Sequence, residues 1–373
     1  MTLDGVRICL VGPLPPPAGG MAVLTEQLAG LLRIDGARVE VVQVNAPYRP
    51  AWAQRLKGVR ALFRLLPYLL GLWRAIGRAD LVQVMANSGL SWHLFARPAL
   101  RVAALRGVPV IVNYHGGEAE EFLADAANSL RRSLRSTSAL LVPSGFLVEV
   151  FARHGIAARI LPNVVDLSRF VPRPKAVSSR SGPHLVVARN LEHIYGADLA
   201  IRAFAEIRRR YPDARLSLTG TGPAEPALKD LAGQLAVADG VQFLGRLDRD
   251  AMIALYQAAD LLLNPSRADN LPGAILEAMA SGVPIIASAV GGVPYFLEHD
   301  RTAFLVPPED PAALAGAALA LLDAPERGSV LAKEALAEVQ RFDWKHVRPV
   351  LLKEYALALG HAPARATGSM ESL

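Results

Sequence analysis

Two carboxylates, Asp269 and Glu277, flank the start of a predicted helix in the stretch "PSRADNLPGAILEAMASGVP", residues 265–284. Pro272 suits the first turn of a helix, and Gly273 leaves the backbone open to a ligand. The positive end of such a helix attracts an anion, for example a diphosphate. Since a carboxylate gains nothing by touching a diphosphate, both acids are predicted to accept hydrogen bonds from hydroxyl groups, those of a ribose and of a sugar.

An alternative interpretation of this stretch needs no ligand. Asp269 or Asn270 would cap the helix, and Glu277 would lie on the protein surface. The residues by themselves leave both interpretations open.

Three further stretches place a candidate side chain or glycine where a predicted strand ends. Arg189, in "VVARNLEHIYG", has a fixed fork of donors that suits the oxygens of a diphosphate and neutralises its charge. His115, in "VNYHGGE", can donate to a sugar hydroxyl or a phosphate, and Gly220, in "LTGTGP", can flank a nucleobase or a phosphate. A purely structural role is the alternative for each of them.

Gly19 and Gly20, in "VGPLPPPAGGMAVL", lie between the first predicted strand and a helix. Glycines there let a ligand approach the free N–H groups of the helix start. An ordinary strand-to-helix turn is the alternative. The spacing G-x-G-x-x-G is absent, which argues against a nicotinamide dinucleotide.

Short apolar runs alternate with helical segments along the chain, and this βαβ rhythm predicts parallel, doubly wound sheets. The expected strands cover residues 7–12, 38–45, 80–87, 108–116 and 138–144, then 184–190, 214–220, 241–245, 260–266, 283–288 and 302–308. The predicted fold class is therefore α/β, with two Rossmann-like domains facing a cleft. Ligands of such sheets bind beyond the carboxyl ends of the strands, where the candidate residues lie.

The lapse into Pro, Ser and Arg near residues 168–183 sets the predicted boundaries. We expect an N-terminal domain over 1–167, a linker over 168–183 and a C-terminal domain over 184–340. A closing helix over 341–360 is expected to pack back on the N-terminal domain, and residues 361–373 are expected to form a flexible tail.

The composition fits two globular domains. At 373 residues the chain exceeds the size of a single core, 52% of it is hydrophobic and 20% is charged. Prolines, glycines and serines interrupt the longest uncharged runs, so no transmembrane helix is expected. The lone cysteine, Cys9, falls in a predicted buried strand, which together with the N-terminal sequence favours a cytoplasmic protein without disulfides.

Taken together, these stretches resemble the GT-B glycosyltransferases, specifically glycosyltransferase family 4, which are retaining enzymes that use nucleotide sugars. The resemblance extends over residues 7–345 and is most specific in "NPSRADNLPGAILEAMASGVPIIAS" and "VGGVPYFLEHDRTAFLVPPED". It implies a donor, UDP- or GDP-linked, bound by the second domain and a hydroxyl acceptor bound by the first. It also implies retention through an oxocarbenium-like transition state, with no cofactor and no metal.

The resemblance further implies roles for individual residues. His115, Arg189 and Asp269 would form the catalytic group, and Glu277 would bind the donor ribose. The remaining donor-binding residues would be Gly19, Gly20, Gly220, Arg267, Leu271, Pro272 and Gly273.

Two departures from the family pattern stand out. Asp269 occupies a position that is usually Glu, so the hydroxyl that it contacts can differ. The lysine that usually follows the arginine is missing, since "RNLEHIYG" has Ile194 and Tyr195 there. Arg267 or Lys229 is the candidate for the missing cation.

Residues 53–78 mix arginines with leucines and Trp73, as a segment lying on an anionic membrane does. Location on the inner face of the membrane, with a lipid-linked acceptor for cell-surface polysaccharide or glycolipid assembly, is one expectation. A helix pair that faces the core with a solvated basic side is the alternative.

Other functions fit the sequence less well. The net charge of +6 suggests an anionic partner, but the basic residues are spread out and aromatic residues make up only 6%, which argues against nucleic acid. A sugar-nucleotide epimerase or phosphorylase of the same fold, or a non-catalytic subunit that binds nucleotide sugars, stays open.

Overall fold

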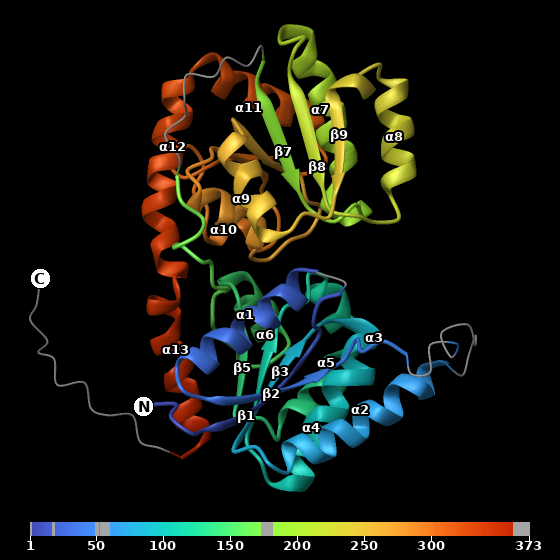
Figure 1. Ribbon diagram of the computed structural model, residues 1–373, viewed down its shortest axis with the longest axis vertical. Coiled ribbons are helices and arrows are strands. Elements are labelled where there is room, and N and C mark those ends of the chain that lie inside the picture. The colour runs from blue at the N-terminus through green and yellow to red at the C-terminus, as the bar shows by residue number, and fades with distance from the viewer. Residues whose placement is uncertain (1, 17–18, 49–51, 53–59, 173–181, 361–373) are drawn as a thin grey trace, which may run out of the picture. The chain divides into compact units, whose positions relative to one another are not determined.

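The computed structural model of the protein describes residues 2–16, 19–48, 52, 60–172 and 182–360 (Figure 1). Pro17, Ala18, residues 53–59 of the predicted membrane segment, most of the predicted linker and the predicted tail lie outside the described residues. Two compact units make up the chain. The first contains residues up to Pro143, Leu147–Leu161 and the chain from Val347, and the second contains Ser144–Phe146 and Pro162–His346.

The first unit is built on a parallel sheet of six described strands in the order β2-β1-β3-β4-β5-β6. The strands are β1 (Arg7–Gly12), β2 (Arg38–Gln43), β3 (Leu81–Ala86), β4 (Val110–Tyr114), β5 (Ala139–Val142) and β6 (Arg159–Ile160). Its helices are α1 (Gly20–Ile34), α2 (Arg60–Ile76), α3 (Gly89–Ser91), the π-helical turn η2 (Trp92–Ala96), α4 (Arg97–Arg106), α5 (Ala119–Leu134), α6 (Gly145–Arg153) and α13 (Trp344–Ala358).

The central strands of this sheet are buried on both faces, as a parallel sheet requires. All six residues of β3 and all five of β4 are buried. Cys9 is buried in β1 as predicted, and burial raises the pKa of its thiol to about 12. From the closing helix, Tyr355 donates to the Gln83 side chain of β3, and Arg348 bonds to Asp35 at 2.6 Å.

The second unit repeats the architecture, with described strands in the order β12-β11-β10-β7-β8-β9. The strands are β7 (His184–Ala188), β8 (Arg215–Thr219), β9 (Val241–Gly245), β10 (Leu261–Asn264), β11 (Ile285–Ser288) and β12 (Phe304–Val306). The helices are η3 (His193–Tyr195), α7 (Ala197–Arg210), α8 (Glu225–Gln234), η4 (Ala238–Gly240), α9 (Arg249–Ala258), α10 (Gly273–Ala280), η5 (Val293–Tyr295), α11 (Pro311–Asp323), α12 (Pro325–Glu338) and η6 (Val339–Phe342).

Successive residues of β7 enter two different cores, one on each face of the sheet. Leu185 and Val187 pack with α7, α8 and α11, whereas Val186 packs with α9 and α10. Figure 1 shows α7 and α10 separated by this sheet. Helices therefore cover both faces, which explains why these strands are uninterrupted apolar runs rather than alternating ones.

The predicted fold class is confirmed, because both sheets are parallel, doubly wound and contain every strand expected from the sequence. One strand was missed. β6 has only two residues, Arg159 and Ile160, both exposed, so no apolar run announces it.

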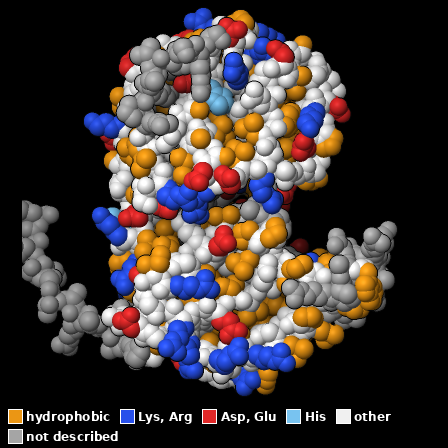
Figure 2. Space-filling model, viewed as in Figure 1, with side chains coloured by type: hydrophobic (Ala, Val, Ile, Leu, Met, Phe, Trp, Pro, Cys, Tyr) orange, Lys and Arg blue, Asp and Glu red, His pale blue; other side chains and the backbone are white. Residues whose placement is uncertain are grey.

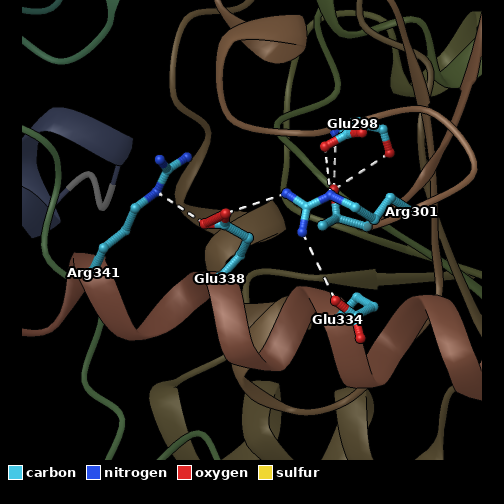
Figure 3. A network of polar contacts seen from close by, with 6 residues as sticks. Glu298, Arg301, Glu334, Glu338 and Arg341 are labelled. Carbon is cyan, nitrogen blue, oxygen red and sulfur yellow. Dashed lines mark hydrogen bonds and ion pairs between the residues drawn. The ribbon is translucent and has the colours of Figure 1, made fainter. Parts of the chain in front are cut away.

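Charged side chains of both signs are scattered over the visible face of the molecule (Figure 2), and one cluster fastens a turn to α12 (Figure 3). Arg301 pairs with Glu298 in its own turn and with Glu334 and Glu338 of α12, at 3.8 and 3.3 Å. Glu338 in turn lies 3.5 Å from Arg341. Each of these solvent-exposed ion pairs contributes little to stability by itself. Together they hold the turn against α12.

No helix among the described residues is both long and apolar enough to cross a membrane.

Candidate functional site

The second sheet changes its winding direction between β7 and β10, which lie side by side in it. The chain that leaves β7 turns toward β8, whereas the chain that leaves β10 turns the opposite way, toward β11 and β12. In open α/β sheets, ligands bind at such a switch point, beyond the carboxyl ends of the strands. The residues that leave β7 and β10 there include Arg189 and Asp269.

Arg189 and Asp269 form a partly buried ion pair at this point. Arg189 Nη2 lies 2.9 Å from Asp269 Oδ2, with side chains 14% and 9% exposed. The Arg189 guanidinium also stacks over the ring of Tyr195, 4.0 Å from its centroid. Asp269 Oδ1 accepts from the Asn270 amide at 3.1 Å. The Arg189 guanidinium is therefore fixed by a carboxylate at one nitrogen and by an aromatic ring against its face.

Several polar atoms near the ends of β7 and β10 have no hydrogen-bond partner among the described residues. They are Nε of Arg189, Nδ2 of Asn264 and Oγ of Ser266. Asn264 and Ser266 are almost fully buried. Because buried polar groups are nearly always satisfied, such a group of atoms indicates a place where a polar ligand or water binds.

The helix α10 begins beside this group without a capping side chain. Its N-cap is Pro272, and neither Asp269 nor Asn270 caps it, so the capping alternative does not hold. A Cβ added to Gly273 would meet nothing within 4 Å. The carbonyl of Leu271 accepts from Asn163 Nδ2 at 2.7 Å, which fixes the loop ahead of the helix. The first N–H groups of α10 are thus open to an anion.

Glu277 lies one turn into α10 and is partly buried rather than on the surface. It accepts a hydrogen bond of 3.0 Å from the hydroxyl of Tyr256, which is fully buried and also lies 3.3 Å from the Ala274 carbonyl. Burial raises the pKa of the Glu277 carboxyl to about 7, against a smaller lowering by Tyr256 and Arg249. A carboxylate that is costly to charge gains most from hydroxyl donors.

Arg267, which was predicted to bind the donor, is paired with side chains and backbone of its own unit. Its guanidinium bonds to Asp198 at 2.8 and 2.9 Å, to Glu309 and to the His193 carbonyl at 2.6 Å. These acceptors use all the N–H groups of the Arg267 guanidinium. Arg267 therefore holds the turn η3, which carries Tyr195.

Lys229, the other candidate for the missing cation, lies on α8. It pairs with Glu225 at 2.7 Å and lies over the Phe243 ring.

Gly220 has a structural reason to be glycine. Its φ is +94°, and an added Cβ would lie 2.4 Å from the Arg189 carbonyl oxygen. Gly220 therefore supports the backbone from which Arg189 projects.

In the first unit, the other predicted residues lie beyond the carboxyl ends of β1 and β4. Gly19 is the N-cap of α1, without a capping side chain, and added Cβ atoms at Gly19 and Gly20 would meet nothing within 4 Å. His115 follows β4, and its amide donates to the Ala86 carbonyl at 2.9 Å. Its Nε2 is buried without a partner among the described residues, and burial lowers the pKa of the ring to about 4. His115 is therefore a neutral imidazole at pH 7.

The structure thus brings together Arg189, Asp269 and the start of α10, with Glu277 one turn behind. Two contributors were missed by the sequence reasoning. Tyr256 gives no local signal, because only the fold brings α9 against α10. Tyr195 was noted only as the residue replacing a lysine, and its stacking on Arg189 was not foreseen. Among the described residues no group of three or more His, Cys, Asp or Glu side chains is arranged to hold a metal ion.

Comparisons with known proteins agree with this geometry. Residues 18–169 match the family model described as "Glycosyltransferase Family 4", and residues 182–324 match "Glycosyl transferases group 1". The chain is 30% identical to a GDP-mannose-dependent alpha-(1-6)-phosphatidylinositol monomannoside mannosyltransferase of Mycobacterium tuberculosis, over 80% of this chain and 85% of the relative. It is 27% identical to the glycogen synthase of the same organism, over 95% of both chains.

Solved structures show the same fold. Sucrose-phosphate synthase from Thermosynechococcus elongatus has a TM-score of 0.76 at 21% identity and covers 95% of this chain and 99% of its own. Anabaena Alr3699/HepE in complex with UDP-glucose has a TM-score of 0.74 at 19% identity, with 94% and 99% covered. From its sequence, its two doubly wound sheets and these relatives, the chain belongs to the group 1, family 4 glycosyltransferases and is a glycosyltransferase with the GT-B fold.

Proposed function

We propose that the protein transfers a sugar from a nucleotide-sugar donor, UDP- or GDP-linked, to a hydroxyl group of an acceptor, with retention of the anomeric configuration. The observation that carries the proposal is the switch point of the second sheet. A paired arginine, polar atoms without partners and an uncapped helix start converge there, one turn away from Glu277. A diphosphate with a sugar at each end complements this set of groups.

Each group then has a task in the transfer. Ribose hydroxyls would donate to Glu277, which is otherwise left with the Tyr256 hydroxyl. Arg189 and the first backbone amides of α10 would stabilise the negative charge that develops on the departing diphosphate. These groups are positioned before the reaction, so their reorganisation costs little in the transition state.

The Arg189–Asp269 pair implies an exchange of partners when the donor binds. Arg189 Nη2 faces Asp269 at 2.9 Å in the protein alone. Phosphate oxygens would compete for this guanidinium, and Asp269 would then accept from a hydroxyl of the transferred sugar. Tyr195 keeps the guanidinium plane in place during the exchange. In this protein an aromatic face therefore stands where a second cation is expected.

Support for the donor and acceptor comes from the relatives. The mycobacterial mannosyltransferase is named for GDP-mannose and a phosphatidylinositol monomannoside, and Alr3699/HepE was solved with UDP-glucose. We propose a sugar or lipid-linked acceptor in cell-surface polysaccharide or glycolipid assembly, on the cytoplasmic side of the membrane. We propose a reaction without a metal ion, because Arg189 and the start of α10 can balance the negative charge of the diphosphate.

A non-catalytic protein that binds nucleotide sugars is the second candidate. The observation in its favour is the absence of the usual lysine, with Ile194 and Tyr195 in its place. Such a protein would bind the nucleotide sugar but would not transfer the sugar, and this distinguishes it from a transferase.

A thermal-shift screen against UDP, GDP, ADP and their sugars tests the site. A ligand that binds only the folded protein raises the melting temperature, by the equivalent of about 2.7 kcal/mol at a hundredfold excess over Kd. We expect one nucleotide family to give a shift that Glu277→Ala abolishes. Glu206→Ala, which removes an exposed glutamate of α7, is the matched control and should keep the shift. If no nucleotide raises the melting temperature, the proposed donor site at the start of α10 is wrong.

A further inference from the structure

The outward face of α2 carries an exposed apolar stripe. Leu66, Leu69, Leu70 and Trp73 are 58, 38, 56 and 45% exposed. Their spacing, at positions i, i+3, i+4 and i+7, places them on one side of the helix. In Figure 2, hydrophobic and basic side chains lie together in the region where Figure 1 shows α2.

The fold does not need this stripe, because α2 has a second apolar face that is buried. Tyr68, Leu72, Ala75 and Ile76 are at most 5% exposed. Tyr68 also donates to the Phe95 carbonyl at 2.6 Å. Since the inner face holds the helix in place, the leucines of the outer face are free for a partner.

The charge around α2 is strongly one-sided. Between residues 41 and 117 the sequence has ten Lys or Arg residues and one acid, Asp80, which gives a net charge of +9. Since the whole chain carries +6, the remaining residues together carry −3. Asp80 itself is paired with Arg7, and Arg78 is paired with Glu40 at 2.7 Å, whereas Arg74 near the end of α2 is exposed.

Exposed tryptophans lie near both ends of α2, and one of them, Trp73, belongs to the apolar stripe itself. Trp52 is 58% exposed and packs edge-on against Phe63, with ring centroids 5.7 Å apart. Trp73 lies 3.8 Å below the guanidinium of Arg106, which also donates to the Trp73 carbonyl. A half-exposed indole beside an arginine, as at Trp73, is typical of the boundary between lipid headgroups and acyl chains.

We propose that the outer face of α2, defined by Leu66, Leu69, Leu70 and Trp73, docks the protein on an anionic lipid surface. The leucines enter the acyl boundary while the arginines contact the headgroups. A second copy of the chain is a poorer occupant, because a symmetric contact would bring two surfaces of like charge together. This inference rests on the proposed function, since it explains how a lipid-linked acceptor is reached.

Flotation of the full chain with vesicles tests the proposal. We expect binding to vesicles that contain phosphatidylglycerol, weaker binding to pure phosphatidylcholine, and loss at high salt. Arg74→Gln should weaken partitioning about fivefold. Leu66→Gln/Leu70→Gln should weaken it about tenfold or more, because two half-exposed leucines no longer enter the bilayer. Val330→Gln, at a 61% exposed position of α12, is the matched control and should change nothing.

Three outcomes would overturn the proposal. They are no flotation of the unmodified protein with anionic vesicles, equal weakening by the control, and a concentration-dependent dimer that Leu66→Gln/Leu70→Gln abolishes. The nucleotide-induced thermal shift distinguishes a failure of the membrane-docking proposal from a failure of the proposed function. The leucine variant should keep that shift, whereas a protein that floats but responds to no nucleotide would contradict the donor site alone.

Discussion

Replacing Glu277 by Gln should stabilise the protein at high pH and have little effect at low pH. The pKa of the Glu277 carboxyl is raised by burial from 4.5 to about 7. Below pH 4.5 the carboxyl is protonated in both states and does not destabilise the folded protein. As the pH rises through 7, the free energy of unfolding falls, because the folded state then has to hold a buried charge. At pH 8.5 this charge costs up to about 3 kcal/mol, which the neutral amide avoids.

Thermal unfolding of both proteins between pH 5 and pH 8.5 measures this effect. The melting temperature of Glu277→Gln should match that of the unmodified protein at pH 5 and exceed it increasingly above pH 7. Glu206→Gln, at an exposed position of α7, should show no such trend. Equal destabilisation of the variant at every pH would contradict a raised pKa of Glu277, since it would mean that the carboxylate is charged and stabilising throughout.

The same pKa predicts a proton release when the donor binds. Ribose hydroxyls that donate to Glu277 favour its charged form and lower its pKa, so near pH 7 about half a proton should leave per nucleotide bound. Titration calorimetry in phosphate and in Tris buffer measures this release, since the two buffers differ in ionisation enthalpy. Identical binding enthalpies in both buffers would contradict the placement of the ribose on Glu277.

The remaining predictions concern the backbone and the arginines around the site. Gly220→Ala should destabilise the protein by more than about 1 kcal/mol in urea unfolding, whereas Gly233→Ala, inside α8, should stabilise it by about 0.5 kcal/mol; equal effects would contradict the argument from φ. Tyr195→Phe should keep the stacking on Arg189 and the nucleotide affinity, while Tyr195→Ala should weaken binding about fivefold, and loss in both would disprove the role of the ring. Arg267→Met should lower stability by about 1–3 kcal/mol, and an unchanged unfolding midpoint would argue against its structural role.

The strands were predictable because a parallel sheet covered on both faces leaves continuous apolar runs in the sequence. The runs "RICLVG" and "DLLLNPS" each contain an observed strand, whereas β6 has two exposed residues and leaves no such run. The start of α10 was also predictable, because a proline followed by a glycine indicates a helix start in the sequence itself.

Partners of the candidate side chains were harder to predict. Arg189 and Asp269 were each expected to bind a ligand, but the sequence does not show that β7 and β10 are neighbours and place the two side chains 2.9 Å apart. Arg267 was predicted to bind the donor, and the sequence does not show that Asp198 and Glu309 lie around its guanidinium. Contacts between residues far apart in the chain carry no local pattern, so these assignments required the structure.

Proton NMR of the anomeric signal during the reaction tests the proposed sugar transfer most directly. The nucleotide sugar that gives the thermal shift would be incubated with a lipid-linked or sugar acceptor. We expect that the donor is consumed, that the product keeps the anomeric configuration of the donor, and that Arg189→Ala slows the transfer at least tenfold while Glu206→Ala does not. Donor binding without any product, or a product of inverted configuration, would contradict the proposed transfer.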